Sequence, residues 1–422
     1  MSATHSPKRI VVIGGGIIGL CTAYYATRLG HRVTILDRGQ PQAEGCSFGN
    51  AGMVVPSHFV PLAAPGMVAL GLKWMWNPES PFYIKPRLNR DLLSWGWNFW
   101  KSATAAHVAR AAPLLRDLSM ASRACFEELA DQFENEFGLV KRGLLMLCKT
   151  QKSLDEEAQM ALRARDLGIP ADVLDARQTA QSDPAIRLDV AGSVYFPKDC
   201  HLSPARLMIA LRKYLETAGA SFSFSTDVTG FIKANSKVSA VRTSRRNFAG
   251  DEFVLCGGAW SSRLARDIGM RLPLQAGKGY SLTLPQPRQL PTLCSILTEA
   301  RVAVTPMNGT LRFGGTMELS GLSEGINPVR VRGIIKSVSN YFPDFTPADF
   351  EGIQPWSGLR PCSPDGMPYI GRTQRFQNLT IATGHAMMGL SLGPITGRIV
   401  SQILSDERPD FDLSLLTPDR FG

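Results

Sequence analysis

The chain has 422 residues, of which 44% are hydrophobic and 19% charged, which is typical of a globular protein with a sizeable core and two or three domains. Lys and Arg number 46 against 36 Asp and Glu, and the net charge of +10 favours an anionic cofactor, substrate or surface. The basic residues are dispersed, with their densest group at Arg245 and Arg246, so we expect no nucleic-acid partner.

The eight cysteines are scattered, and none forms a CxxC pair or a Cys/His group at metal-ligand spacing, so no metal site is expected. We therefore expect a reduced, cytoplasmic protein. An uncharged stretch runs from Ile10 to Thr27, directly after Lys8 and Arg9. Its four glycines and the strand-like run behind it are typical neither of a signal peptide nor of a membrane span.

The first elements in the chain predict a βαβ unit. Residues 9–14 (RIVVIG) and 32–37 (RVTILD) are short β-branched runs typical of buried parallel strands, and residues 19–30 between them predict a helix that ends at a glycine.

A glycine motif, Gly14-x-Gly16-x-x-Gly19, lies in the turn between this first strand and the helix. Glycines there allow a tight turn and close approach to a pyrophosphate, which the helix N-terminus stabilises. Asp37 ends the second strand, where an acid bonds ribose hydroxyls. Together these features predict a dinucleotide site, but they do not separate NAD from FAD.

The remaining chain alternates between helical and strand-like patterns. Helices are expected over residues 91–135, 155–168, 204–219 and 328–341, and strands over 139–149, 192–197, 220–231, 238–258 and 280–316. Residues 56–90 are rich in proline and aromatic residues without a clear period, and residues 378–406 predict a strand, a glycine turn and a last helix.

Six further motifs follow Asp37 in a fixed order. They are SFGNAG (47–52), AAPG (63–66), KGYSLTLP (278–285), LRFGGTMEL (311–319), GLRPCSPDGMPYIG (358–371) and TGHAMMG (383–389). The series resembles the superfamily of FAD-dependent amine and amino-acid oxidoreductases over essentially the whole chain. It looks most like the bacterial D-amino-acid dehydrogenases and is similar in less detail to glycine and sarcosine oxidases. The resemblance implies non-covalent FAD, with Cys46 as the one doubtful candidate for a flavin linkage.

The resemblance also implies an α/β fold with two domains. A discontinuous, Rossmann-like FAD-binding domain would carry an inserted α+β substrate domain built on an antiparallel-rich sheet. We expect the FAD-binding domain to comprise residues 1–85, 195–275 and 352–422, and the substrate domain residues 86–194 and 276–351.

Carried over position by position, the resemblance assigns many residues to FAD. The three glycines of the turn, with Ile17 beside them, would hold the pyrophosphate, and Asp37, followed by Arg38, would take the adenosine ribose. The residues expected along the rest of the cofactor are Ser47, Asn50, Ala51, Gly52, Met53, Val228, Gly257, Gly258, Trp260, Gly384, His385, Met388 and Gly389. The last four are expected at the N-terminus of the last helix, whose dipole would stabilise negative charge on reduced flavin.

Three residues are candidates for contact with substrate. Arg360, in GLRP, is expected to hold a substrate carboxylate with two parallel hydrogen bonds, as the resemblance also implies. Tyr280 and His58 could line the pocket, but each could instead have a purely structural role. Glycine oxidases carry a second arginine where Met387 and Met388 stand here, which favours a roomier and more apolar site.

These assignments predict an enzyme that oxidises the α C–N bond of a small amino acid, either a D-amino acid or a cyclic imino acid such as a D-proline derivative. The predicted acceptor is a quinone or another acceptor that is not oxygen. Two alternatives stay open: a glycine/sarcosine-type oxidase that releases hydrogen peroxide, and a flavin-carrying subunit of a multisubunit dehydrogenase. An RNA-modifying flavoprotein is a more distant alternative.

Five of the seven tryptophans fall in residues 72–86 and 92–100, among Lys73, Lys85 and Arg90. This segment could be a buried aromatic wall of the substrate domain. It could also be a surface that rests on lipid headgroups, which suits both Trp and basic residues. The second reading would place the protein on the cytoplasmic face of a membrane.

Overall fold

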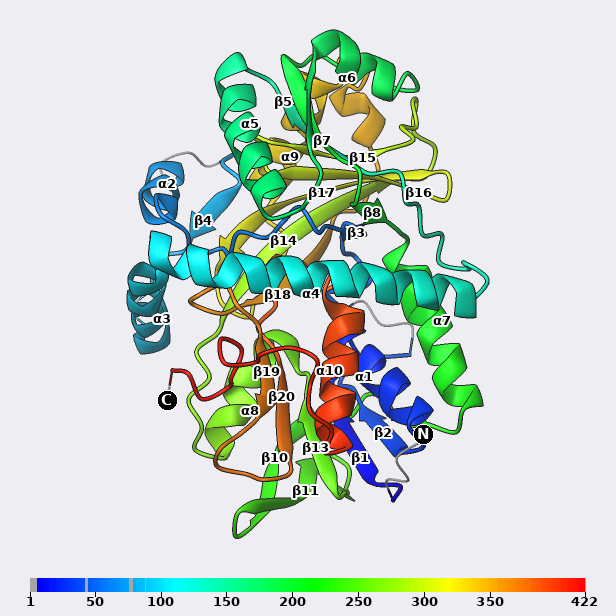
Figure 1. Ribbon diagram of the computed structural model, residues 1–422, viewed down its shortest axis with the longest axis vertical. Coiled ribbons are helices and arrows are strands. Elements are labelled where there is room, and N and C mark those ends of the chain that lie inside the picture. Colours follow the sequence, from blue (N-terminus) through cyan, green and yellow to red (C-terminus); the bar gives the residue numbers. More distant parts are fainter. Residues whose placement is uncertain (1–5, 42–44, 76–78, 88, 422) are drawn as a thin grey trace.

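The computed structural model describes residues 6–41, 45–75, 79–87 and 89–421. The two largest β-sheets lie in the lower and the upper half of the molecule, and the long helix α4 (Ala105–Gln132) crosses between them (Figure 1). Side chains of α4 contribute to both halves, since Ala111 packs in the core of the lower half and Ala112 in the core of the upper half.

The lower sheet has the strand order β19-β20-β13-β1-β2-β9, and its neighbouring strands are parallel except for the pair β19–β20. Its strands are β1 (Arg9–Ile13), β2 (Arg32–Leu36), β9 (Ser221–Ser223), β13 (Glu252–Leu255), β19 (Tyr369–Arg372) and β20 (Leu379–Thr383). The predicted βαβ unit is therefore confirmed, with α1 (Ile17–Arg28) between β1 and β2.

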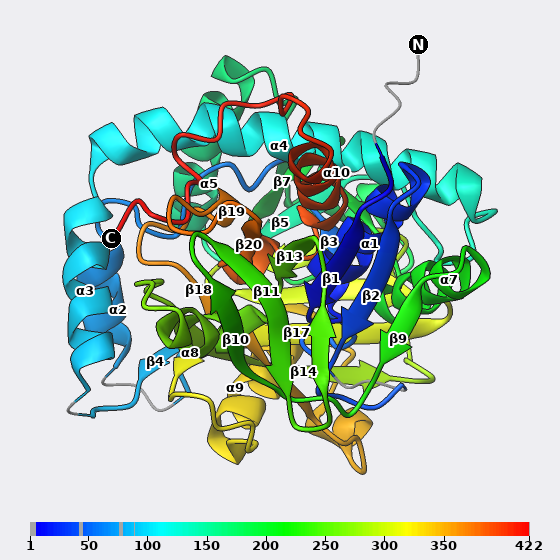
Figure 2. The same cartoon turned by 90° about the horizontal axis from the view of Figure 1, so that it is seen from below.

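Both faces of this sheet are buried, which explains its β-branched composition. Ile10 and Val12 of β1 pack against one set of helices, and Val11 and Ile13 pack against the opposite layer. The first layer comprises α1, α7 (Pro204–Thr217) and α10 (Gly393–Leu404). The second comprises β10 (Val228–Ala234), β11 (Lys237–Thr243), β12 (Asn247–Ala249) and α8 (Ser261–Asp267). Figure 2 shows β10 and β11 on one side of β1 and β2, and α1 and α10 on the other.

The upper sheet is mostly antiparallel and has the order β18-β14-β17-β16-β15-β5-β7-β6, with β4 paired to β17. Its strands are β4 (Phe82–Ile84), β5 (Leu144–Cys148), β6 (Asp172–Asp175), β7 (Gly192–Phe196), β14 (Gln275–Leu284), β15 (Cys294–Leu297), β16 (Val302–Met307), β17 (Thr310–Leu319) and β18 (Trp356–Cys362). Helix α9 (Pro328–Tyr341) packs on one face, through Ile334 and Val338. The other face turns toward the lower half of the molecule at β14, β17 and β18 (Figure 1).

The remaining elements connect these layers. They are β3 (Met53–Val54), β8 (Cys200–His201), α2 (Met67–Trp74), α3 (Arg90–Ser102), α5 (Gln151–Asp166), α6 (Ala176–Ser182) and three short 3₁₀ helices, η1 (Gly258–Trp260), η2 (Pro347–Phe350) and η3 (Ala386–Met388). The helix expected over 91–135 is two helices, because α3 ends at Ser102 and Thr104 caps α4 by accepting a hydrogen bond from the amide of His107.

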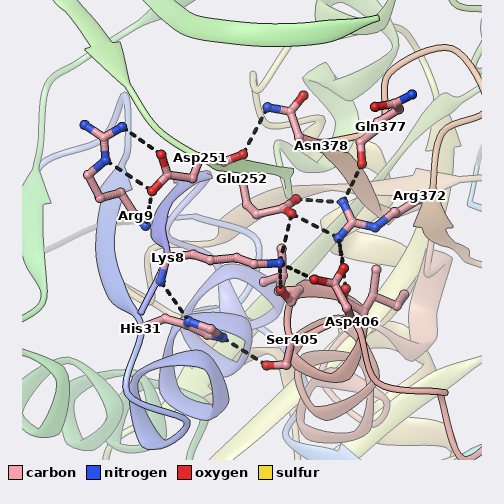
Figure 3. Close-up of polar contacts among 12 residues, drawn as sticks. Lys8, Arg9, His31, Asp251, Glu252, Arg372, Gln377, Asn378, Ser405 and Asp406 are labelled. Carbon is pink, nitrogen blue, oxygen red and sulfur yellow. Dashed lines mark hydrogen bonds and ion pairs between the residues drawn. The ribbon is translucent and has the colours of Figure 1, made fainter. Parts of the chain in front are cut away.

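Figure 3 shows an ionic cluster that links residues from both ends of the chain. It lies where the parallel strands β1 and β13 begin, at the opposite end of these strands from the glycine turn. The carboxylate of Glu252 accepts from Lys8 Nζ at 3.4 Å and from Arg372 at 2.7 and 3.0 Å. Asp406, just beyond α10, binds the same two cations at 2.6 and 3.1 Å. The cluster joins β1, β13, β19 and the end of α10, and so holds segments far apart in the sequence as one unit.

Two strands belong to a different sheet from the one expected for their domain. Strand β4 and strand β18 fall in the ranges 1–85 and 352–422, but both pair within the upper sheet. The proposed domain boundaries stay a prediction. Within the described ranges, no helix combines the length and hydrophobicity needed to span a bilayer.

Candidate functional site

The turn between β1 and α1 has the shape of a phosphate cradle. Gly14 has φ of +110°, and a β-carbon there would overlap the carbonyl oxygen of Cys256, directly after β13. A β-carbon at Gly19 would overlap the carbonyl of Gly14. Both positions therefore require glycine. Helix α1 begins after Gly16, which has no side chain to cap it, and the amide of Ile17 donates to Ser47 Oγ instead. This arrangement fits an anionic pyrophosphate.

Asp37 lies directly after β2 and faces the same turn. Its carboxylate accepts from the amide of Gly15 at 2.6 Å and from the amide of Gly39 at 2.6 Å. Its carbonyl accepts from Thr226, two residues before Val228, which starts β10. The tertiary structure thus brings Val228 to the end of β2, close to the residue expected at the ribose.

Arg38 and Trp260, which were assigned to the cofactor separately, lie in contact. The guanidinium carbon of Arg38 is 3.4 Å from the centroid of the Trp260 ring, a cation–π arrangement. Arg38 also forms an ion pair with Glu324 at 3.1 Å. Gly257 and Gly258 lie between β13 and Trp260, beside Gly14. The expected adenosine and pyrophosphate residues therefore gather at the carboxyl ends of β1, β2 and β13, where doubly wound sheets bind their ligands.

The loop over residues 45–52 connects this turn to the upper sheet. Ser47 Oγ accepts from the amide of Ile17 at 3.0 Å, at the start of α1. On the other side, Ser281 Oγ of β14 donates to the carbonyl of Gly49 at 3.2 Å, and Ala51 lies where a β-carbon at Gly314 would contact it. The loop is held between the two sheets.

Arg312 of β17 holds this loop from the upper sheet and was missed by the sequence analysis. Its NH1 donates to the carbonyls of Phe48 at 3.1 Å and Asn50 at 2.8 Å, and its Nε donates to Thr283 Oγ1 at 3.0 Å. Burial lowers the pKa of Arg312, although the guanidinium stays a cation. Arg312 stands in the motif LRFGGTMEL, but nothing in the spacing showed which segment it would contact.

Arg360 lies on the same face of the upper sheet as this loop. Its NH1 donates to the carbonyl of Thr316 at 2.7 Å, and its guanidinium fills the space of a β-carbon at Gly279. Thr316 has φ of +70°, which is unusual for a β-branched residue. It lies in a bulge, because Lys278 pairs with Glu318 while Tyr280 pairs with Gly315.

Cys46 lies near Arg360. Burial raises the pKa of the Cys46 thiol, and the nearby charge of Arg360 opposes this shift. The thiolate, which is the nucleophilic form of cysteine, is therefore disfavoured at neutral pH.

Tyr280 lies on the opposite face of β14. Its side chain packs with Ile334 of α9, and its hydroxyl donates to Glu318 Oε2 at 2.9 Å. Burial, followed by this bond, raises the pKa of Tyr280. Lys278, on the same face, pairs with Glu318 at 3.5 Å. Because neighbouring residues of a strand alternate between faces, the structure does not bring Tyr280 to Arg360.

His58 belongs to a short chain of polar side chains. Its Nδ1 lies 2.9 Å from Ser57 Oγ, and Ser57 donates to the buried carboxylate of Asp199 through both its hydroxyl and its amide. Burial, and then the charge of Arg301, lower the pKa of His58 to about 4. Burial raises the pKa of Asp199 to about 7. Neither Ser57 nor Asp199 was expected, because 142 residues separate them.

The segment 383–389 was expected at the start of the last helix, and this detail is wrong. Helix α10 begins at Gly393, and residues 386–388 form the 3₁₀ turn η3. Gly384 and Ala386 have φ of +81° and +48°, which are incompatible with a continuous helix. Helix α10, which follows the segment, lies beside α1, because glycines 393 and 397 let it approach Ile17 and Cys21 closely.

His385 and Met388 in this segment have different surroundings. His385 is buried, and its Nε2 lies 3.0 Å from Thr396 Oγ1 of α10. Burial lowers the pKa of His385 to about 3. Met388 is half-buried and packs against both the lower core and the core that includes Met53 and Val55. The stretch 53–55 and Met388 therefore meet between the two halves of the molecule, with Gly389 directly after it.

A pocket of about 470 Å³ lies next to the loop. Its walls include Phe48, Gly49, Ser281, Arg312 and Trp356. The indole of Trp356 covers both Gly49 and Gly358, since a β-carbon at either glycine would overlap it. Trp356, Gly358 and Arg360 alternate along β18, so the pocket wall at Trp356 and Arg360 share one face of this strand.

The tryptophan-rich segments divide between core and surface. Trp95 is buried, and its Nε1 donates to the carbonyl of Cys362 at 2.8 Å. Trp97 and Trp100 of the same helix α3 are 56% and 57% exposed, and their rings stack at 5.1 Å. Trp76 lies outside the described residues.

A family model described as FAD dependent oxidoreductase matches residues 9–403. The chain is 32% identical to a D-amino acid dehydrogenase of Bradyrhizobium diazoefficiens, over 98% of this chain and 99% of that protein. It is 33% identical to a D-amino acid dehydrogenase of Granulibacter bethesdensis, over 98% and 100%.

Its fold is also similar to that of a glycine oxidase from Geobacillus kaustophilus, with a TM-score of 0.80 at 24% identity over 99% of this chain and 100% of that chain. An L-proline dehydrogenase from P. horikoshii has the same fold at a TM-score of 0.73 and 16% identity, over 98% of each chain. Since the family model spans nearly the whole chain, and the glycine turn and Asp37 have the geometry that a dinucleotide requires, the protein belongs to the FAD-dependent oxidoreductases and is an enzyme whose cofactor is FAD.

Proposed function

We propose that the protein is a dehydrogenase that oxidises the α C–N bond of a small amino acid, either a D-amino acid or a cyclic imino acid such as D-proline or hydroxyproline. The observation that carries this proposal is the position of Arg360. Its guanidinium lies over Gly279, on the sheet face that the loop 45–52 approaches. The two curated relatives described above are named for the same kind of activity.

In this proposal Arg360 orients the substrate. A guanidinium binds a carboxylate through two parallel hydrogen bonds, which fixes the α-carbon and its hydrogen in one direction. Bound FAD supplies the acceptor for the hydride that leaves the α-carbon. The amine nitrogen contributes its lone pair to the new C=N bond, so the amine must be neutral when the hydride leaves. Water then hydrolyses the imino acid from a primary amine to an oxo acid and ammonia.

The substrate is tested by anaerobic bleaching of the yellow protein with a panel of D-, L- and cyclic amino acids. We expect bleaching by D- or cyclic substrates, and the protein should bind their carboxylate through Arg360. Arg360→Ala should keep its flavin but lose most turnover with carboxylate substrates, whereas Arg245→Ala, at an exposed position, serves as the matched control. Full turnover in Arg360→Ala would exclude this substrate model.

The proposed acceptor is a quinone or another acceptor that is not oxygen. Stoichiometric hydrogen peroxide from substrate in air would favour the alternative of a glycine/sarcosine-type oxidase. Turnover of the isolated chain with an artificial dye would exclude a flavin-carrying subunit whose chemistry lies in another chain. We also propose that FAD is bound non-covalently, which predicts that acid precipitation releases all flavin into the supernatant.

Contact with a membrane surface is part of this proposal. Trp97, Trp100 and Leu93 are exposed on one face of α3, and Lys101 Nζ lies 5.1 Å from the Trp97 ring. Exposed Trp beside basic residues favours the headgroup region of an anionic bilayer, where a quinone could be reached. Co-sedimentation with vesicles that contain phosphatidylglycerol should decrease in the double variant Trp97→Ser/Trp100→Ser. It should not decrease in Leu162→Ser, at an exposed position of α5. Equal binding by both variants would argue against α3 as the contact.

A further inference from the structure

A short polar chain joins the His58 ring to a carboxyl group in the interior. Ser57 Oγ donates to Asp199 Oδ2, and the Ser57 amide donates to Asp199 Oδ1 at 3.1 Å. The same Ser57 Oγ lies 2.9 Å from His58 Nδ1. Asp199 has no solvent-exposed surface, so its connection to the outside along this path runs through Ser57 and His58.

The backbone brings Ser57 and Asp199 together. Strands β3 and β8 pair antiparallel, with Met53 opposite His201 and Val54 opposite Cys200. Asp199 directly precedes β8, and Ser57 follows β3 by three residues, so the short ladder brings the two side chains together. The carbonyl of Asp199 also accepts from the amide of Gly143 at 3.0 Å.

The stretch that carries His58 runs past the flavin segments. The amide of Val55 donates to Ser391 Oγ at 3.0 Å, and Met53, Val55 and Phe59 pack in one cluster with Met388. His58 therefore lies on a segment that connects the loop 45–52 to the residues after η3.

The hydrogen bonds couple the His58 tautomer to the protonation of Asp199. When Asp199 is ionised, Ser57 must donate its only hydroxyl proton to the carboxylate, so Ser57 Oγ accepts from Nδ1–H and His58 Nε2 carries a free lone pair. When Asp199 is protonated, it donates to Ser57 Oγ, which then donates to Nδ1, and the ring proton resides on Nε2. One proton on Asp199 thus changes His58 from an acceptor to a donor at Nε2.

The charges around the two groups permit this change near neutral pH. Burial raises the pKa of Asp199 to about 7, against the opposing effects of Ser57 and, more distantly, of Arg123 on α4. Cys200 and Cys294 are the thiols that interact with this carboxyl, and burial raises the pKa of both.

The charged partners of these groups lie on two further elements. Arg123 itself is paired with Glu127 at 2.9 Å. Arg301, next to β16, acts on His58, whose pKa of about 4 keeps the ring neutral. The ring therefore changes its tautomer without gaining a charge.

We propose that Asp199 and Ser57 form a proton relay that sets the His58 tautomer and receives the proton that His58 removes from the substrate ammonium group. This inference rests on the proposed function, and it requires in addition that the amino-acid substrate held by Arg360 reaches His58. His58 would be the catalytic residue, and Ser57 and Asp199 would position its hydrogen.

The proton transfer is balanced at every atom. The substrate N–H bond breaks, and its proton forms a bond to His58 Nε2. The Nδ1 proton moves to Ser57 Oγ, and the Ser57 hydroxyl proton moves to Asp199 Oδ2. The substrate nitrogen keeps its electron pair, which the oxidation requires, and the proton stored on Asp199 returns to water by the reverse path after the product leaves.

The first test is independent of substrate. In the FAD-loaded enzyme with ¹⁵N-labelled histidine, His58 is identified by the signals that His58→Gln lacks. Well above the Asp199 pKa of about 7 we expect Nδ1 to carry the proton, and well below it Nε2. Asp199→Asn should show the Nε2–H form at every pH, since the NH₂ group of the introduced amide donates to Ser57 Oγ and cannot accept from it. A tautomer that is the same on both sides of pH 7 in the wild type would overturn the relay.

The second test uses the pH profile of kcat/KM. The wild type should lose activity as the pH falls through about 7, the pKa of Asp199. Asp199→Asn should be ~100-fold slower at high pH, the usual contribution of a general base, and Ser57→Ala should lose the inflection. Asp183→Asn removes another buried carboxylate, which binds the amides of Thr292 and Leu293, and should keep the wild-type profile. An unchanged inflection in folded Ser57→Ala would overturn the proposal.

The two tests also separate this inference from the proposed function. If the His58 tautomer changes near pH 7 but the protein oxidises no amino acid, the hydrogen-bonded chain is supported and the proposed function is wrong. Amino-acid oxidation with a pH profile unaffected by Ser57→Ala would keep the function and remove the relay.

Discussion

The guanidinium of Arg360 occupies the space in which a side chain at Gly279 would begin. The two residues lie on neighbouring strands, since Gly279 pairs with Gly358 and Gly277 with Arg360. The bulge at Thr316 turns a carbonyl toward the same guanidinium at 2.7 Å. The absence of a side chain at Gly279 and the carbonyl of Thr316 in the bulge thus determine together where the Arg360 guanidinium lies.

Gly279→Ala should displace the Arg360 guanidinium and leave the FAD content of the protein unchanged. A hydrogen bond to a charged group contributes ~1.5–3 kcal/mol, so KM for a carboxylate substrate should rise by about 10- to 100-fold. Gly96→Ala, where an added β-carbon meets open space, is the control. Steady-state kinetics and the flavin-to-protein ratio check both variants. An unchanged KM in Gly279→Ala would show that the position of Arg360 does not matter for substrate binding.

Asp37→Ala should weaken the retention of FAD. The variant removes the carboxylate that holds the amides of Gly15 and Gly39, and with it the expected acceptor for the ribose hydroxyls. We expect a reduced flavin content after gel filtration and a larger Kd by fluorescence titration. Asp251→Ala, at an exposed acid on the opposite edge of the sheet, should leave both unchanged. Full occupancy in Asp37→Ala would contradict the ribose role.

Arg312→Ala should loosen the loop 45–52 and lower stability. The carbonyls of Phe48 and Asn50 would lose a charged donor, and an unsatisfied buried acceptor costs ~1–3 kcal/mol. Urea unfolding should show this loss in the apoprotein, and FAD affinity should fall as well because Ser47 of this loop contacts the start of α1. Arg288→Ala, whose side chain is exposed, is the comparison. Equal free energies of unfolding for Arg312→Ala and Arg288→Ala would rule out Arg312 as the anchor of the loop.

Acid should destabilise the protein through His385. Burial lowers its pKa from 6.5 to about 3, so the unfolded chain takes up a proton below pH 6.5 while the folded protein does not. The stability from this group is present above pH 6.5 and is lost as the pH falls through the folded value. One such proton changes the free energy of unfolding by ~1.4 kcal/mol per pH unit. His385→Gln should flatten the curve measured by urea unfolding between pH 6 and 5, and an equally steep curve would count against a neutral, buried His385.

The elements of the FAD turn could be predicted because their signals are local. The strands, the helix and Gly14, Gly16 and Gly19 lie within about thirty residues. Gly19 is required by a backbone contact inside this unit, and Gly14 by one with Cys256, directly after β13. The same holds for α9, whose bounds match the expected helix 328–341. The segment 383–389 was expected at the start of the last helix, but it lies before that helix. The positive φ values at Gly384 and Ala386 that separate the two leave little trace in the hydrophobic pattern.

Contacts between distant segments could not be predicted in this way. Arg312 and the loop 45–52, Arg38 and Trp260, and Ser57 and Asp199 each combine residues from different elements, and no period in the sequence records their approach. Tyr280 shows the same difficulty within one strand. Alternation separates Tyr280 from Ser281, but only the packing of α9 on one face and the loop on the other decides which of them turns toward Arg360.

The sequence by itself thus determined the cofactor turn, the order of the elements and the arginine that is proposed to bind substrate. The tertiary structure alone decided which side chains surround that arginine and which carboxyl is connected to His58 through Ser57. The physical reason is that strand periods and glycine turns depend on neighbours in the chain, whereas burial, hydrogen-bond partners and pKa shifts depend on segments that meet only after the two sheets have packed.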